Sequence, residues 1–243
     1  DQQQIAHALA LGVAEGVGSA IVLRAITNLP VGWGVGAQAF DLRGMAMSFG
    51  GPEHQLFRWA AEEVNAFCDG HAPETSGGWA AMRTQAKLPG PQAAAEKMAG
   101  AVAAALTGAR ELDGAGTLSL DEVFSAEQLV FDLEIKDHVQ RLIAGIEPSI
   151  DPGACLSDVA EGIESGFMGL ESTLSQYRQV YWLPRLMERR SLAGWLAAGA
   201  PDLRRRAKEI AREQAKKHDY ELPADLLREL DRIYARAESE LVA

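Results

Sequence analysis

The stretch Val31-Gly32-Trp33-Gly34-Val35-Gly36-Ala37-Gln38-Ala39-Phe40 is apolar, mostly small, and not amphipathic. A continuous apolar run of this length favours a strand buried on both faces, although its three glycines weaken a strand interior. Residues 4–26 before it are Ala-rich and predict a helix that ends ahead of Pro30. Residues 52–67 after it predict a second helix, because Pro52 suits a first helical turn. Helix, strand and helix in this order are typical of a parallel α/β sheet.

The same order continues along the chain. Short strands are predicted at residues 71–76 and 109–112, a loop or short strand at 114–120, and helices at 92–106 and 126–143, the second capped by Ser125. Later elements are all helical: residues 156–162, 173–190 with a bend near Pro184, 192–198, 201–218 and 223–241. Three or four strands are too few for an eight-stranded barrel. The pattern therefore predicts an α/β fold, either half a barrel with a helical extension or a small open sheet.

Composition and charge exclude several classes of protein. The 243 residues are 47% hydrophobic and 23% charged, as in ordinary globular chains. The net charge of −11 divides into 9 basic and 23 acidic residues in 1–177, and 14 basic and 11 acidic residues in 178–243. This balance argues against a general nucleic-acid binder and suits a cationic substrate.

Two further features bear on where the protein works. Residues 5–23 form the most apolar stretch, but His7 and Glu15 interrupt it, so we expect a buried helix rather than a membrane span. Cys68 and Cys155 make no disulfide framework, which favours the reducing cytoplasm. Cys68 and His71 have metal-ligand spacing, but two ligands do not make a zinc site, so we expect no directly bound metal.

Five segments, in order, resemble motifs of the trimethylamine methyltransferase family. FDLRGMAMSFGGPE (40–53) resembles the family's FDMRTGxxxFGSPE, and TQAKLPGPQAAAEK (84–97) resembles TDxKxxDxQAxxEK. SAEQLVFDLEI (125–135), RLIAGIE (141–147) and YWLPRLMERR (181–190) resemble SYExLVLDxEI, RLLRGIE and FWxPxLxDRR. The five segments follow the family's order along residues 40–190.

The resemblance implies the C-terminal half of a (β/α)8 TIM-type barrel, roughly twice this length when complete. Residues 1–147 would form the half-barrel, and residues 148–243 a helical C-terminal extension packed on it. The family transfers a methyl group from a small methylated amine to the cobalt of a corrinoid (cobalamin) carried on a separate protein. The expected partners are therefore the corrinoid protein and the N-terminal half of the barrel or another subunit, with no nucleic acid and no membrane.

One position indicates the branch of the family. Lys87 stands where some members carry pyrrolysine, and members without pyrrolysine resemble glycine betaine methyltransferase and act on quaternary amines. A quaternary ammonium already holds a good leaving group, so Co(I) can attack its methyl directly. Gln85, Gly90 and Ser172 depart from the family's two aspartates and its histidine. These departures support an alternative, a non-catalytic member that binds a methylated amine or a partner protein.

The resemblance and the residue chemistry give eight candidate site residues. Lys87 is the catalytic candidate, and the substrate-binding candidates are Trp33, Phe40, Asp41, Trp79, Gln92, Glu96 and Glu127. Trp33, Phe40 and Trp79 would form an aromatic cage for a quaternary ammonium.

Each candidate also has a structural interpretation. The aromatic residues would belong to the core, and Asp41 would be a turn carboxylate paired with Arg43. Asp132 and Glu134 are interpreted as ordinary surface charges. The basic run at 204–208 is interpreted as a solvated helix face, with a docking surface for an acidic corrinoid protein as the alternative.

The edge of a half-barrel would be exposed. An unpaired parallel strand at 31–40 invites association, and the helix at 4–26 is apolar on nearly every face. We therefore expect these residues to be stable only beside other strands, from an N-terminal segment, a separate subunit or a second copy, and we expect an oligomer.

Overall fold

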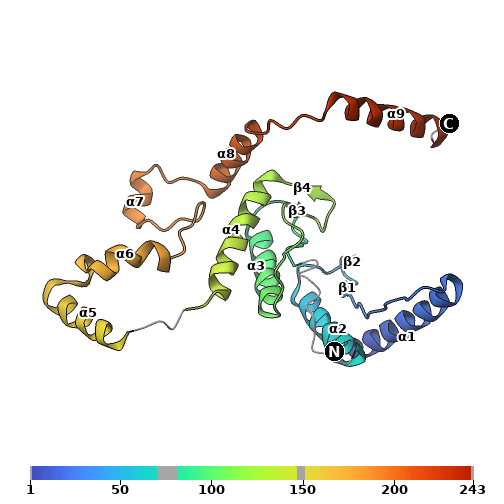
Figure 1. The fold of residues 1–243 in the computed structure, drawn as a ribbon, viewed down its shortest axis with the longest axis horizontal. Helices are drawn as coiled ribbons and strands as arrows, with labels where there is room; N and C mark the ends of the chain where they lie inside the picture. Colours follow the sequence, from blue (N-terminus) through green and yellow to red (C-terminus); the bar gives the residue numbers. More distant parts are fainter. Residues whose placement is uncertain (1, 70–80, 147–150, 242–243) are drawn as a thin grey trace. The chain divides into compact units, whose positions relative to one another are not determined.

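The computed structural model describes residues 2–69, 81–146 and 151–241. The helices of its N-terminal part are α1 (Gln2–Thr27), α2 (Pro52–Asp69), α3 (Pro91–Leu106) and α4 (Ala126–Ile143) (Figure 1). Next come α5 (Pro152–Ser165), the short 3₁₀ helix η1 (Phe167–Gly169), α6 (Glu171–Val180), α7 (Leu192–Ala197), α8 (Leu203–Lys216) and α9 (Ala224–Leu241). The chain divides into two compact units, residues 1–208 and 209–243. The predicted division at residue 147 stays a prediction.

The strands of the described residues form two short antiparallel hairpins. β1 (Phe40–Asp41) pairs with β2 (Ala46–Met47), and β3 (Thr117–Leu118) pairs with β4 (Val123–Phe124). Residues 109–112 form no strand, and the strand predicted at 71–76 lies outside the described residues. The described part is mostly helical and shows neither a parallel pair nor a closed barrel. It is consistent with a fragment of an α/β fold, and the barrel stays a prediction.

The predicted strand at 31–40 joins a ladder only at its last residue. Asn65 of α2 bonds instead to the backbone of Val35: its Oδ1 accepts from Val35 N at 2.6 Å, and its Nδ2 donates to Val35 O at 3.1 Å. The side-chain amide thus supplies one donor and one acceptor, as a neighbouring strand would. The glycines at 32, 34 and 36 weaken this stretch as a strand, which is a physical reason for the difference.

Most helix predictions are confirmed. α4 begins as predicted, with Ser125 Oγ accepting from Gln128 N at 3.2 Å. The prediction of one bent helix over 173–190 is wrong, because α6 ends at Val180 and residues 181–191 have no regular structure. Pro184 explains this, since it has no N–H and restricts the residue before it.

The core of the first unit lies between α3 and α4, which pack against each other. Met82, Ala101, Ile135 and Val139 form its largest buried apolar cluster. Small residues on α3 allow this close packing: Ala93, Gly100, Ala101, Ala103 and Ala104 are all buried. These two helices carry two of the five family-like motifs, so the core fixes the motifs relative to each other.

The prediction that α1 is buried is wrong for the described residues. Ile21 is 64% exposed and Ile26 is 75% exposed, although α1 contacts α2 and Trp33 lies against Gly16. The segment Ile5–Thr27 is long and apolar enough to cross a membrane by length and composition. A core helix of a soluble protein and a signal sequence meet the same criterion. α1 is therefore an apolar helix that is largely exposed in the described part of the structure.

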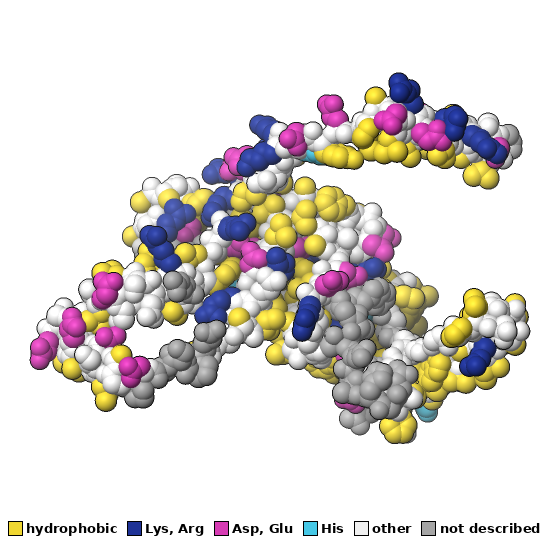
Figure 2. Space-filling model, viewed as in Figure 1, with side chains coloured by type: hydrophobic (Ala, Val, Ile, Leu, Met, Phe, Trp, Pro, Cys, Tyr) yellow, Lys and Arg dark blue, Asp and Glu magenta, His cyan; other side chains and the backbone are white. Residues whose placement is uncertain are grey.

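The second unit, residues 209–243, contains the end of α8 and all of α9. Figure 2 shows hydrophobic side chains along one side of α9. The large apolar residues of this helix are half-exposed or more: Leu226, Leu227, Leu230, Ile233, Tyr234 and Leu241. Their spacing of three and four residues makes α9 amphipathic, as its sequence predicts.

Candidate functional site

The segment at 84–87 lies between the two hairpins. Leu120 N donates to Thr84 O and Ser119 N donates to Ala86 O, both at 2.8 Å, which holds the segment beside β3. On the other side, Gln85 Nε2 donates to the backbone oxygen of Met47 in β2. The structure therefore brings the first two family-like motifs into contact, although about 40 residues separate them in sequence.

Glu96 of α3 is the centre of this contact. Its carboxylate accepts from Thr84 Oγ1 at 2.5 Å, from Gln85 N at 2.8 Å and from Gln92 Nε2 at 2.8 Å. A Cβ on Gly50 would overlap the same carboxylate, so a larger residue there would displace the Glu96 side chain from these contacts. Two predicted residues, Gln92 and Glu96, thus meet, and their contacts fix the loops around them.

A pocket of about 210 Å³ opens beside the β1–β2 hairpin. Its lining includes Phe40, Asp41, Arg43, Ser48 and Glu53. Phe40 is half-exposed, at 49%, so its ring is accessible. Arg43 binds Asp41 through two side-chain hydrogen bonds at 3.0 Å and one backbone N–H at 2.9 Å. These bonds lower the pKa of Asp41 to about 2, so this carboxylate is ionised throughout the physiological range.

His54 supports the same loop from beneath. Gln38 Nε2 donates to Ser48 O at 2.8 Å and lies 3.0 Å from His54 Nδ1, while the rings of Phe49 and His54 are 5.3 Å apart. Burial, together with the nearby charges of Arg58 and Arg83, lowers the pKa of His54 to about 4. His54 is therefore neutral at pH 7 and acts as a packing and hydrogen-bonding group.

Other predicted residues lie apart from this pocket. Lys87 Nζ donates to Ser119 Oγ at 2.6 Å beside the β3–β4 hairpin, and the Trp33 ring contacts α1 at Gly16. Glu127 is buried at the start of α4, where it pairs with Arg204 at 2.6 Å and Lys208 at 3.6 Å. Trp79 lies outside the described residues.

The interpretation of Asp132 as a surface charge is wrong. Asp132 and Lys97 are both fully buried, and Lys97 Nζ lies 2.6 Å from Asp132 Oδ2. Gly116 N and Gln128 Nε2 also donate to Asp132, each at 2.7 Å, and Lys97 donates to Gly114 O at 3.0 Å. Burial raises the pKa of Asp132 and lowers that of Lys97, while the attraction between the two charges opposes both shifts. This pair joins the second and third family-like motifs inside the core.

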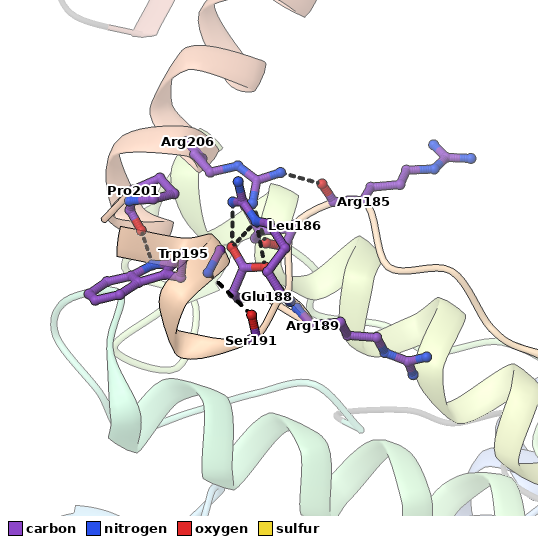
Figure 3. A network of polar contacts seen from close by, with 10 residues as sticks. Arg185, Leu186, Glu188, Arg189, Ser191, Trp195, Pro201 and Arg206 are labelled. Carbon is purple, nitrogen blue, oxygen red and sulfur yellow. Dashed lines mark hydrogen bonds and ion pairs between the residues drawn. The ribbon is translucent and has the colours of Figure 1, made fainter. Parts of the chain in front are cut away.

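Glu134, also interpreted as a surface charge, is buried as well. Its carboxylate accepts from the backbone N–H groups of Arg185, Leu186 and Met187 at 3.2, 2.9 and 2.9 Å. Arg206 donates to the carbonyl oxygens of Leu186 and Arg185 at 3.0 and 2.9 Å (Figure 3). The clamp formed by Glu134 and Arg206 replaces regular structure in this loop. The basic run at 204–208 is therefore not simply a solvated face.

Membership in a family-like motif was the sequence signal that could have marked Asp132 and Glu134 as buried. Asp132 and Glu134 both stand inside the third family-like motif, while their clamp partners lie in other motifs or in α8. Among the described residues, no group of three or more His, Cys, Asp or Glu side chains is placed to hold a metal ion. The side chains that line the pocket beside β1–β2 include an aromatic ring, two carboxylates, an arginine and a hydroxyl.

Comparison with known proteins gives one family. The family model for trimethylamine methyltransferase (MTTB) matches residues 4–242. The chain is similar to trimethylamine methyltransferase MttB of Methanosarcina barkeri, at 32% identity over 90% of this chain and 44% of the relative. It is similar to MttB2 of Methanosarcina mazei, at 32% over 90% and 44%, and to MttB of Desulfitobacterium hafniense, at 28% over 79% and 38%. The chain thus spans less than half the length of these relatives, and it belongs to the trimethylamine methyltransferase family.

Proposed function

We propose that the protein containing this chain transfers a methyl group from a methylated amine to the cobalt of a corrinoid carried on a separate protein. Family membership supports the reaction class. The observation that carries the substrate class is the pocket beside β1–β2, where the Phe40 ring and the carboxylates of Asp41 and Glu53 come together. Because the chain covers 44% of its relatives, the activity is proposed for the whole protein.

The pocket chemistry suits a quaternary ammonium. Such a cation has no N–H to donate, so it is recognised by aromatic faces and by carboxylates at a distance. Phe40 offers a half-exposed ring, and Asp41 keeps its charge because its pKa is about 2. Arg43 orients Asp41 and offsets part of its charge, so Glu53 supplies the second carboxylate of the pocket. The ordinary lysine at position 87 also supports a quaternary donor.

The corrinoid is the methyl acceptor, and therefore a second substrate. Its Co(I) electron pair forms the cobalt–carbon bond while the C–N bond breaks and its pair stays on nitrogen. A pocket of about 210 Å³ is too small for a corrin macrocycle, so the described residues around the hairpin do not fit it. We assign its docking to no residue of this chain and derive no residue role from it. The role proposed for the pocket is to bind and orient the amine.

The barrel and the location of the protein are also proposals. We propose that residues 1–147 complete a (β/α)8 barrel with another segment or subunit, in the cytoplasm, and that this segment covers α1. The exposure of Ile21 and Ile26 supports this proposal. We expect this segment or subunit to co-purify with the chain, and we expect the chain to lose stability without it.

Substitution in the pocket tests the proposal. In the whole protein, Phe40→Leu and Asp41→Asn are expected to raise KM for a quaternary amine about 5- to 30-fold, as the loss of a cation–π or charge contact predicts. Phe67→Leu is the matched control, because Phe67 is 86% exposed on α2 and does not line the pocket.

The assay follows methyl-cobalt absorbance with a panel of quaternary and tertiary amines. Equal KM values for Phe40→Leu and Phe67→Leu would contradict the assignment of the pocket. Binding of an amine by calorimetry without any methyl transfer would favour the non-catalytic alternative, for which Gln85, Gly90 and Ser172 are the motivating residues.

A further inference from the structure

Positive charge is concentrated in one segment of an acidic chain. Residues 181–208 carry seven basic and two acidic side chains, whereas the whole chain has a net charge of −11. A groove of about 540 Å³ runs through this segment. The carboxylate of Glu188 belongs to its lining, beside three apolar and three basic residues: Leu183, Pro184 and Met187, and Arg189, Arg190 and Arg206. We call these seven residues the arginine groove.

Part of this charge is not offset by carboxylates. Arg190 is paired with Glu188 at 2.5 Å, but Arg206 donates to two neutral carbonyl oxygens and so keeps its full charge. Arg189 lies over the Trp182 ring, 5.3 Å from its centroid. Figure 3 shows the side chains of Arg185 and Arg189 directed away from Arg206. The groove is therefore a cationic surface with an apolar floor.

The clamp makes the groove a fixed surface. Five hydrogen bonds from Glu134 and Arg206 hold the backbone of residues 185–187. A loop held in this way loses little conformational entropy when a partner binds, so its affinity per contact is higher.

A complementary surface exists on the same chain, on α5. Residues 151–171 contain five acidic and no basic side chains. Leu156, Val159 and Ile163 follow a spacing of three and four residues, and Leu156 and Ile163 are 72% and 74% exposed. In Figure 2 the acidic side chains gather near α5, apart from the basic ones. α5 thus presents an apolar stripe bordered by carboxylates.

α5 packs on η1 through Gly162. Gly162 packs against the Phe167 ring so closely that a Cβ at this position would overlap it, which fixes α5 on η1. Arg141 anchors the end of α6 to α4 through Val180 O at 2.8 Å. These contacts leave Leu156 and Ile163 of the α5 stripe exposed.

We propose that the arginine groove of one molecule receives the acidic apolar stripe of α5 from a second copy of this chain. The apolar stripe covers Leu183, Pro184 and Met187, and the carboxylates of Glu161 and Glu164 face the arginines. Each copy carries both surfaces, so we propose that two copies dock reciprocally as a dimer. This inference does not depend on the methyl-transfer proposal.

Charge reversal combined with sedimentation velocity tests the dimer. In the whole protein, Arg189→Glu with Arg190→Glu makes the groove acidic, and Glu161→Lys with Glu164→Lys makes α5 basic. Each double variant then has two like-charged surfaces, so its dimer dissociation constant is expected to rise on the order of 100-fold. An equimolar mixture of the two double variants regains opposite charges at both contacts, so it is expected to form a heterodimer close to wild-type affinity.

A control variant and a salt titration complete the test of the dimer. Arg232→Glu with Arg236→Glu reverses the same charge on α9 and is expected to leave the dimer unchanged. Raising NaCl from roughly 0.05 M to roughly 0.5 M is expected to weaken the wild-type dimer, because the screening length falls. A wild-type monomer at low salt, reversed variants that still dimerise, or a mixture that fails to re-associate would overturn the proposal. Binding of polyglutamate by a monomeric wild type would instead indicate another acidic partner and would also overturn it.

Discussion

Removing the charge of Lys97 is expected to destabilise the core strongly. In Lys97→Met the Asp132 carboxylate stays fully buried and keeps two hydrogen-bond donors, Gly116 N and Gln128 Nε2, but loses its only described cation. Breaking a buried pair from one side costs about 3–5 kcal/mol, because an uncompensated charge remains in the interior. That is a large fraction of the roughly 5–15 kcal/mol that stabilises a domain.

A double variant, which completes a double-mutant cycle, separates the effect of charge from that of packing. Lys97→Met with Asp132→Leu removes both charges, so it is expected to recover about 2–3 kcal/mol of the loss. The remaining loss comes from Gly116 N, Gln128 Nε2 and Gly114 O, which lose their Asp132 or Lys97 partners, at roughly 0.5–1.5 kcal/mol each.

Urea denaturation of the whole protein, followed by circular dichroism, measures these free energies of unfolding. Lys136→Met is the matched control on α4, where the 42% exposed ammonium contacts Asp137 at 3.3 Å, and it is expected to cost less than about 0.5 kcal/mol. A cost below about 1 kcal/mol for Lys97→Met, or a double variant no more stable than Lys97→Met, would refute the reasoning.

Three further predictions follow from the same contacts. Glu134→Gln replaces a carboxylate that accepts three N–H groups by a neutral amide, so amide hydrogen exchange at residues 185–187 is expected to accelerate at least 10-fold; unchanged exchange would contradict the clamp. Between pH 6.5 and about 4 the unfolded state protonates His54 while the folded state does not, so lowering the pH over this range is expected to reduce the free energy of unfolding by up to about 3 kcal/mol. If the free energy of unfolding of His54→Gln depends on pH as steeply as that of the wild type, His54 is not the origin. Ser125→Ala removes the cap of α4 and is expected to cost about 1 kcal/mol in thermal denaturation, whereas an equal cost for Ser175→Ala, inside α6, would show that capping is not the cause.

Local sequence signals predicted the helices well. Ser125 and Pro52 mark their starts through the first helical turn alone, so no tertiary information is needed for α4 and α2. The strand at 31–40 depends on partners that the sequence pattern does not identify. Its apolar character indicates burial, but hydrogen bonding decides whether it becomes a strand, and in the structure Asn65 provides those bonds at Val35. Pro184 was interpreted as a bend where it marks irregular backbone.

The candidate site was predictable to a similar extent. Phe40, Asp41, Gln92 and Glu96 were named from motifs and lie around one hairpin or its contact with α3, whereas Lys87 and Glu127 lie elsewhere. Asp132 and Glu134 were assigned to the surface because charged residues are rarely buried without partners. Their partners, Lys97 and the backbone of residues 185–187, are 35 to 53 positions away in sequence and are set by tertiary packing.

The central claim is that this chain belongs to a working amine methyltransferase. Its most direct test is the fate of a ¹³C-labelled methyl group, followed by NMR after the whole protein is mixed with a methyl-labelled quaternary amine and a reduced corrinoid protein. The account predicts that the label leaves nitrogen, appears on cobalt in one-to-one amount with the demethylated amine, and does so more slowly at subsaturating amine with Phe40→Leu. Label that stays on nitrogen for every quaternary and tertiary amine, while the amine still binds, would contradict the account.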